Sequence, residues 1–129
     1  GLSGAGKSTI AELSGLPIIH EETMLLSPID EHRFRLESIP FRRDYKKLVF
    51  EGEIENIFRI FQDKDTYLKD ISDSLKLAHV LSALWSFNVF HHDKKRYNAQ
   101  IIEYCEQLCQ RINVGELYFR RNNDFLNLI

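Results

Sequence analysis

The residues at the very start of the chain are those whose types and spacing most clearly indicate chemistry. They fit the pattern G-x-x-x-x-G-K-[ST] and run Gly1-Leu2-Ser3-Gly4-Ala5-Gly6-Lys7-Ser8. The glycines allow backbone dihedrals that a Cβ would block, so that successive N–H groups can point inward at an anion. A helix predicted directly after the loop adds its positive N-terminal end to the same place. The pattern therefore predicts a loop that holds the phosphates of a nucleotide such as ATP.

Two side chains of this loop have separate predicted roles. Lys7 supplies an ammonium group for the β- and γ-phosphates, and the hydroxyl of Ser8 can ligate Mg²⁺. The residues predicted to contact the nucleotide are Gly1, Ser3, Gly4, Ala5, Gly6, Lys7, Ser8 and Thr9. The alternative is a glycine-rich turn before a helix with no ligand, and the helical pattern that follows favours the phosphate loop.

Glu21 and Glu22 form the second candidate. They follow the apolar run 16–20, which predicts a buried strand, and open α/β sheets place their ligands at the carboxyl ends of strands. Phosphoryl transfer needs a group that takes the proton of the acceptor hydroxyl and a metal that bridges the phosphates. Two adjacent carboxylates can divide this work, because their mutual repulsion makes one of them a better proton acceptor. The alternative is a solvated acidic turn.

Other polar side chains have weaker claims to a site. His20 precedes the carboxylates, and a half-exposed position at a strand end is the favoured interpretation. Arg42 and Arg43 either neutralise charge in the transition state or lie in a solvated basic loop. For Arg120 and Arg121, capping at the surface is favoured over a role in binding.

The rest of the pattern predicts the elements that position these residues. Helices are predicted at 7–13, 66–85 and 95–112. Asp65 or Thr66 is the predicted cap of the helix at 66–85, and Asn113 to Gly115 are expected to end the helix at 95–112. Asp124 is predicted to cap a final helix. Predicted strands span 16–20, 23–26, 33–37, 55–61 and 116–121, although 55–61 also suits a helix. The residue patterns of segments 46–50 and 87–92 do not predict one type of secondary structure.

Interleaved strands and helices predict a layered α/β fold in one domain over 1–129. A phosphate loop normally follows a buried strand, and this sequence begins at Gly1 without an initiator Met. We therefore expect the chain to be a fragment, truncated at the phosphate loop.

Composition limits the classes of partner. The chain has 129 residues and a net charge of −2, which gives no strong signature for binding nucleic acid or a membrane surface. No apolar run approaches the roughly 20 residues of a membrane span. Two cysteines and no visible signal peptide predict a cytoplasmic, reducing location. The oligomeric state stays open.

Cys105 and Cys109 are the only cysteines, spaced by one helical turn on an apolar face. This spacing favours packing in the core over metal binding. A zinc site would need two more ligands, for which His91, His92 and Asp93 are the candidates.

The order of these pieces resembles the catalytic core of HPr kinase/phosphorylase and its smaller relatives, the HPr-kinase-like serine kinases. That core is itself similar to phosphoenolpyruvate carboxykinase. Three stretches carry the resemblance: the loop at 1–9, the helix and apolar run that end in Glu21-Glu22, and the segment 112–126. The family usually has Asp-Asp where this chain has the two glutamates. Its signature for binding the acceptor protein is not recognisable here.

The resemblance implies an ATP-binding, Mg²⁺-dependent phosphotransferase with a protein or peptide serine as acceptor. It implies catalytic roles for Lys7, Glu21 and Glu22, and a metal held by Ser8 and Glu22. Which glutamate is the base stays open. Because the acceptor signature is missing, the resemblance implies the kinase superfamily rather than HPr as the substrate.

Two other functions share the same loop. One is a small-molecule kinase of the nucleoside or adenylylsulfate type, which would require an arginine-rich lid that the sequence does not clearly show. The other is a non-catalytic module that binds a nucleotide for regulation. Measuring phosphoryl transfer against ATP binding alone separates this last function from the two kinases.

Overall fold

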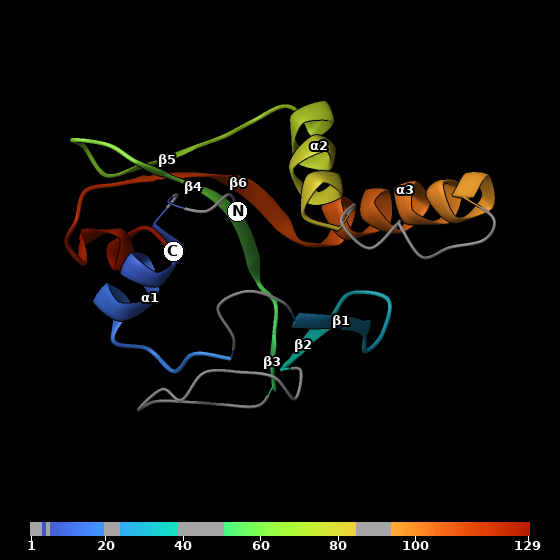
Figure 1. The fold of residues 1–129 in the computed structure, drawn as a ribbon, viewed down its shortest axis with the longest axis horizontal. Coiled ribbons are helices and arrows are strands. Elements are labelled where there is room, and N and C mark those ends of the chain that lie inside the picture. Colours follow the sequence, from blue (N-terminus) through green and yellow to red (C-terminus); the bar gives the residue numbers. More distant parts are fainter. Residues whose placement is uncertain (1–3, 5, 20–23, 39–50, 85–93) are drawn as a thin grey trace.

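The computed structural model describes residues 4, 6–19, 24–38, 51–84 and 94–129 of the chain. These residues form a mixed α/β structure with two small sheets and three α-helices (Figure 1). The mixed α/β class expected from the sequence is therefore confirmed.

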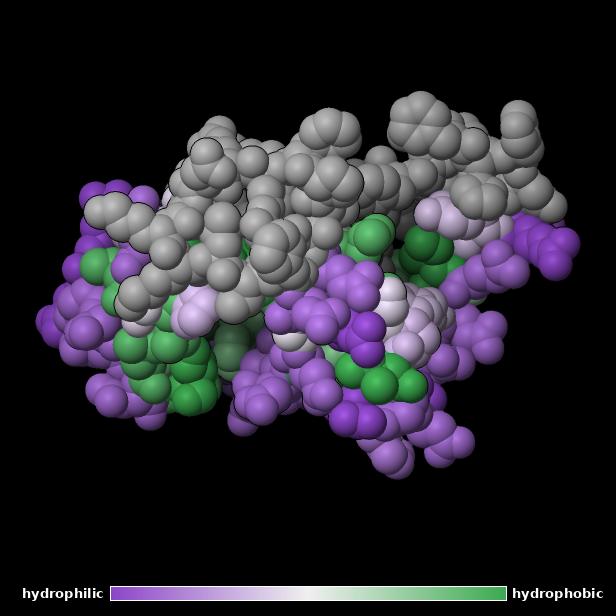
Figure 2. Space-filling view, turned by 90° about the horizontal axis from the view of Figure 1, so that it is seen from below, coloured by the Kyte–Doolittle hydropathy of each residue, from purple (hydrophilic) through white to green (hydrophobic). Residues whose placement is uncertain are grey.

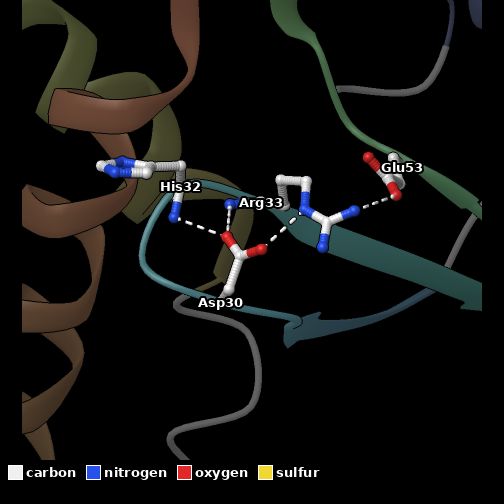
Figure 3. A network of polar contacts seen from close by, with 4 residues as sticks. All are labelled: Asp30, His32, Arg33 and Glu53. Carbon is white, nitrogen blue, oxygen red and sulfur yellow. Dashed lines mark hydrogen bonds and ion pairs between the residues drawn. The ribbon is translucent and has the colours of Figure 1, made fainter.

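The first sheet is antiparallel and contains β1 (Met24–Pro28), β2 (Phe34–Ser38) and β3 (Glu51–Glu53) in that order. Asp30 organises the turn between β1 and β2 (Figure 3), since its carboxylate accepts the backbone N–H groups of His32 at 2.8 Å and Arg33 at 3.0 Å. The Arg33 guanidinium pairs with Asp30 at 2.7 Å and with Glu53 at 3.2 Å. The His32 and Arg33 donors hold the pKa of Asp30 below its usual value. This network joins the hairpin turn to β3.

The second sheet has the order β4-β6-β5 and contains β4 (Asn56–Gln62), β6 (Asn113–Phe119) and β5 (Tyr67–Lys69). β4 and β6 run parallel, whereas β5 is antiparallel to β6. Because successive side chains of a strand point to opposite sides, the sheet presents two different faces.

In the described ranges, three α-helices and one short 3₁₀ turn accompany the two sheets. They are α1 (Lys7–Ser14), α2 (Asp73–Leu84), α3 (Lys94–Arg111) and η2 (Asp124–Asn127). α1 and η2 lie together on one side of the second sheet, and α2 and α3 lie at its other end (Figure 1). Gly15 ends α1 with φ 62°, and its N–H donates to the carbonyl of Glu12.

The buried side chains fall into two clusters. The larger contains Phe34, Val80, Cys105, Leu108, Ile112 and Val114, and the smaller contains Leu117, Phe119 and Phe125. β6 contributes to both clusters, so this strand connects the region of α2 and α3 with the region of α1.

The expected strand at 16–20 is wrong for the residues that the structure describes. Ile18 makes only an isolated bridge, and the side chain of Leu16 is 52% exposed. Pro17 explains the difference, because proline has no N–H to donate to a ladder.

The expected helix at 66–85 is wrong at its start. Tyr67 and Leu68 belong to β5, where they pair with Tyr118 and Leu117 of β6, and α2 begins only at Asp73. Tertiary pairing overrides the helical pattern here. The structure also replaces the expected cap: the backbone N–H of Leu75 donates to the Ser72 hydroxyl at 3.3 Å.

The C-terminal region differs in smaller ways. Asn113 to Gly115 do not end the preceding helix but begin β6, which stops at Phe119. Asp124 is the first residue of a 3₁₀ turn and Asn123 is its N-cap, so the expected capping by Asp124 is wrong. The strands predicted at 23–26, 33–37 and 55–61 and the helices predicted at 7–13 and 95–112 are confirmed with shifted ends.

In the described ranges no helix is long and apolar enough to cross a bilayer. Apolar side chains reach the surface in separate patches between hydrophilic areas (Figure 2). The largest exposed fractions among them belong to Leu25, Ile129 and Leu16.

Candidate functional site

Two glycines of the glycine-rich loop, Gly4 and Gly6, have left-handed backbone dihedrals. Gly4 and Gly6 have φ of 82° and 96°, and no residue other than glycine has a positive φ in the described part of the chain. Gly6 is the N-cap of α1, and its carbonyl accepts the N–H of Ile10 at 2.9 Å. The left-handed dihedrals explain why glycine stands at both positions.

Gly6 lies at the carboxyl ends of the two parallel strands. A Cβ at this position would come within 2.8 Å of both the Gln62 Nε2 and the Phe119 Cζ atoms. Gln62 is the last residue of β4 and Phe119 is the last of β6, and the two are in register. Gly6 therefore lies at the kind of sheet edge where open α/β sheets bind their ligands.

Apolar packing holds α1 against this edge. Ile10 and Leu13 pack against the cluster of Leu117, Phe119 and Phe125. The rings of Phe119 and Phe125 meet edge to face, with centroids 6.3 Å apart. Because α1 begins directly after Gly6, this packing also places the N-terminal end of the helix at the carboxyl ends of β4 and β6.

Of the predicted phosphate contacts that the structure describes, Gly4 and Gly6 precede α1, and Lys7, Ser8 and Thr9 lie in its first turn. Lys7 and Thr9 are half-buried, and Ser8 is exposed. That turn contains no acidic residue, and Gly6 provides no side-chain cap. The N-terminal end of α1 therefore combines a lysine with the positive end of the helix dipole, which attracts anions.

Several predicted site residues lie outside the described residues. They are Gly1, Ser3, Ala5, His20, Glu21, Glu22, Arg42, Arg43, His91, His92 and Asp93. Their predicted roles stay predictions. Arg120 is described and forms a surface ion pair with Asp124 at 3.1 Å, and its expected capping role stays a prediction.

Both cysteines pack in the interior, as expected. Cys105 is fully buried and Cys109 is half-buried, and both are free thiols. Burial raises the pKa of Cys105 to about 11, and burial also raises the pKa of Cys109. Across the ranges that the structure describes, no three His, Cys, Asp or Glu side chains come together to hold a metal ion.

A second polar cluster lies on the opposite face of the sheet from α1, and the sequence patterns did not indicate it. The side chain of Glu116 is only 7% exposed; it lies 2.9 Å from the His79 Nε2 atom and accepts the Tyr118 hydroxyl at 3.0 Å. The Nζ atom of Lys69 is 3.9 Å away. These contacts, the bond with His79 first, lower the pKa of Glu116. Both carboxylate oxygens have partners, so this cluster ties α2 to the sheet rather than exposing a base.

Sequence reasoning also missed Gln62 and Phe119 as supports of the loop. The parallel pairing of β4 with β6 brings together segments far apart in the chain, and local periodicity carries no information about that pairing. The signal that was available is the position of Gln62, a polar residue directly after the apolar pair Ile60 and Phe61.

A scan against protein-family models, a search of curated proteins and a search of solved structures each found no match. The resemblance to HPr-kinase-like enzymes therefore rests on the residues of this chain alone.

Proposed function

We propose that this chain binds ATP with Mg²⁺ and transfers the terminal phosphoryl group to a hydroxyl, as a phosphotransferase of the HPr-kinase-like type. Its fold would then be a P-loop domain similar to that of HPr kinase and phosphoenolpyruvate carboxykinase. One observation carries the proposal: the left-handed Gly4 and Gly6 lead into α1 at Lys7, across the carboxyl ends of β4 and β6.

The chemistry of phosphate binding follows from that arrangement. Backbone N–H groups of the loop and the first turn of α1 donate to phosphate oxygens, and the Lys7 ammonium neutralises charge on the β- and γ-phosphates. The Ser8 hydroxyl is exposed at the start of the helix, and oxygen donors suit Mg²⁺. The Ser8 hydroxyl would help to hold Mg²⁺, which would supply positive charge during phosphoryl transfer.

Glu21 and Glu22 supply the acid–base chemistry of the proposal. One carboxylate accepts the proton of the acceptor hydroxyl, and Glu22 together with Ser8 supports the metal. A serine of a protein or peptide is the proposed acceptor, in keeping with the resemblance described above.

The test measures ATP binding and phosphoryl transfer separately in the full-length protein. Lys7→Ala is expected to abolish nucleotide binding. Glu21→Gln or Glu22→Gln is expected to abolish transfer of labelled γ-phosphate to serine peptides while binding survives. Lys95→Ala and Glu103→Gln are matched controls, since both residues are exposed on α3.

Three outcomes would contradict parts of the proposal. If both glutamine variants transfer phosphate normally, the assignment of the carboxylates is wrong. Binding of ATP without transfer to serine peptides or to nucleosides would identify a non-catalytic module. Failure of the wild-type protein to bind ATP at all would refute the phosphate site itself.

A further inference from the structure

The Gln62 side chain lies against Gly6, the glycine at which α1 begins. Its Nε2 atom would be 2.8 Å from a Cβ at Gly6, and its Cδ atom would be 3.5 Å away. The carboxamide therefore lies directly against the loop backbone, one residue before Lys7.

The position of Gln62 in the sheet explains why it can reach the loop. It is the final residue of β4, and the next backbone N–H, that of Asp63, donates to the carbonyl of Phe119 at 2.9 Å. This bond fixes the carboxyl end of β4 against that of β6. Ile60 points to the same face of the sheet as Gln62 and packs in the cluster beneath α1.

The chemistry of the side chain suits an anionic ligand. A carboxamide is neutral and offers two N–H donors, so it can bond a phosphate oxygen without bringing charge of its own. A hydrogen bond to a charged acceptor is stronger than one between neutral groups. Gln62 itself is exposed, so no burial requirement accounts for its position on the loop.

We propose that Gln62 is a positioning residue of the phosphate site, whose carboxamide donates to the terminal phosphate of the bound nucleotide beside Gly6. The inference rests on the proposed function and adds to it a residue that the motif does not contain. If Gln62 contacts only the terminal phosphate, recognition depends on the number of phosphates.

Two substitutions test the donor. Gln62→Glu keeps the size of the side chain but places a negative charge beside the phosphates, and Gln62→Met keeps the approximate length without a donor. Loss of one hydrogen bond to a charged group predicts that Gln62→Met weakens ATP binding roughly ten-fold or more. Gln62→Glu is expected to weaken it further.

Asn56→Asp is the matched control. It makes the same change from amide to carboxylate on the same strand, but at the amino end, where Asn56 accepts from the Nδ2 of Asn113 at 3.1 Å. A seven-residue strand is about 20 Å long, so this charge lies far from the loop. ATP binding by Asn56→Asp is expected to equal that of the wild type.

The measurement is calorimetric titration of adenosine, AMP, ADP and ATP into each folded variant, with the melting temperature checked first. In the Gln62 variants, the expected result is a loss of affinity that grows from AMP to ATP and is absent for adenosine. If Gln62 only supports the fold, its substitution should weaken the binding of all phosphorylated ligands equally. If the wild type binds ATP and both Gln62 variants bind it equally well, the inference is wrong and the phosphate site stands. If the wild type binds none of these ligands, both proposals fail.

Discussion

The two faces of the second sheet are built from alternate residues of the same strands, yet they contact different helices through different interactions. On one face, Leu117 and Phe119 are buried beneath α1 together with Phe125. On the other face, Glu116 bonds to His79 of α2, and Tyr118 stacks on its neighbours. The helix α1 is therefore held by apolar packing, whereas α2 adds the bond between His79 and Glu116 to apolar packing in the cluster of Val80 and Val114.

The difference shows how the sheet positions a candidate site. Packing of aromatic rings is dense and tolerates little change in volume, so it fixes the loop at Gly6 in one place. The polar face carries a stack of aromatic rings across its three strands. Tyr67 and Phe61 lie on either side of Tyr118, at centroid distances of 4.6 and 4.9 Å. Three predictions test the contrast between the faces.

The largest effect is expected on the apolar face. Phe119 is 0% exposed, and Phe119→Ala is expected to lower the free energy of unfolding by about 3–5 kcal/mol, as for other buried aromatic truncations. Urea denaturation of the variant measures this loss. Phe61→Ala on the polar face is the comparison, and a smaller loss is expected because Phe61 is only half-buried. Equal losses of unfolding free energy would show that the two faces contribute equally to stability.

The next effect concerns the loop that the apolar face supports. Gly6→Ala and Gly15→Ala both place a Cβ in the left-handed region, which costs roughly 1–2 kcal/mol. At Gly6 the Cβ also meets Gln62 and Phe119, and such overpacking adds about 1–3 kcal/mol. At Gly15 no atom lies within 4 Å, so the strain acts alone.

Thermal unfolding of the two glycine variants checks this difference. Gly6→Ala is expected to melt at the lower temperature. If Gly15→Ala lowers the melting temperature equally, the contact of Gly6 with the ends of β4 and β6 contributes nothing to stability.

The smallest effect is expected on the polar face. Glu116→Gln removes a charge-assisted bond to His79 and is expected to cost about 1–3 kcal/mol near neutral pH. The pKa of Glu116 is held below its ordinary 4.5, so its charged form stabilises the fold above that pH. This contribution disappears as the pH falls through the lowered pKa of the folded protein.

Denaturation of wild type and Glu116→Gln across acidic pH measures the effect. The two curves should lie apart above pH 4.5 and converge below it. Glu103→Gln, at an exposed position of α3, is the control and should follow the wild type throughout. A separation that persists in acid would mean that shape rather than charge at Glu116 matters.

Local signals account for the parts of the fold that were predicted correctly. The glycine spacing predicted where α1 begins, alternation predicted β2, and helical periodicity predicted α3. The aromatic and β-branched residues of β4, with the polar stop after them, predicted that strand. β5 was missed because Tyr67 and Leu68 form a strand only when β6 pairs with them. The contact of Gln62 with Gly6 was missed for a related reason, because parallel pairing depends on the assembled fold and not on neighbours in sequence.

The contact between Gly6 and Phe119 joins positions near opposite ends of this sequence. Such a long-range contact forms late in folding, because the entropy of closing a large loop opposes it. During synthesis, the glycine turn leaves the ribosome well before β6 exists to support it. The nascent chain therefore gains the support of Phe119 for Gly6 only after β6 has emerged.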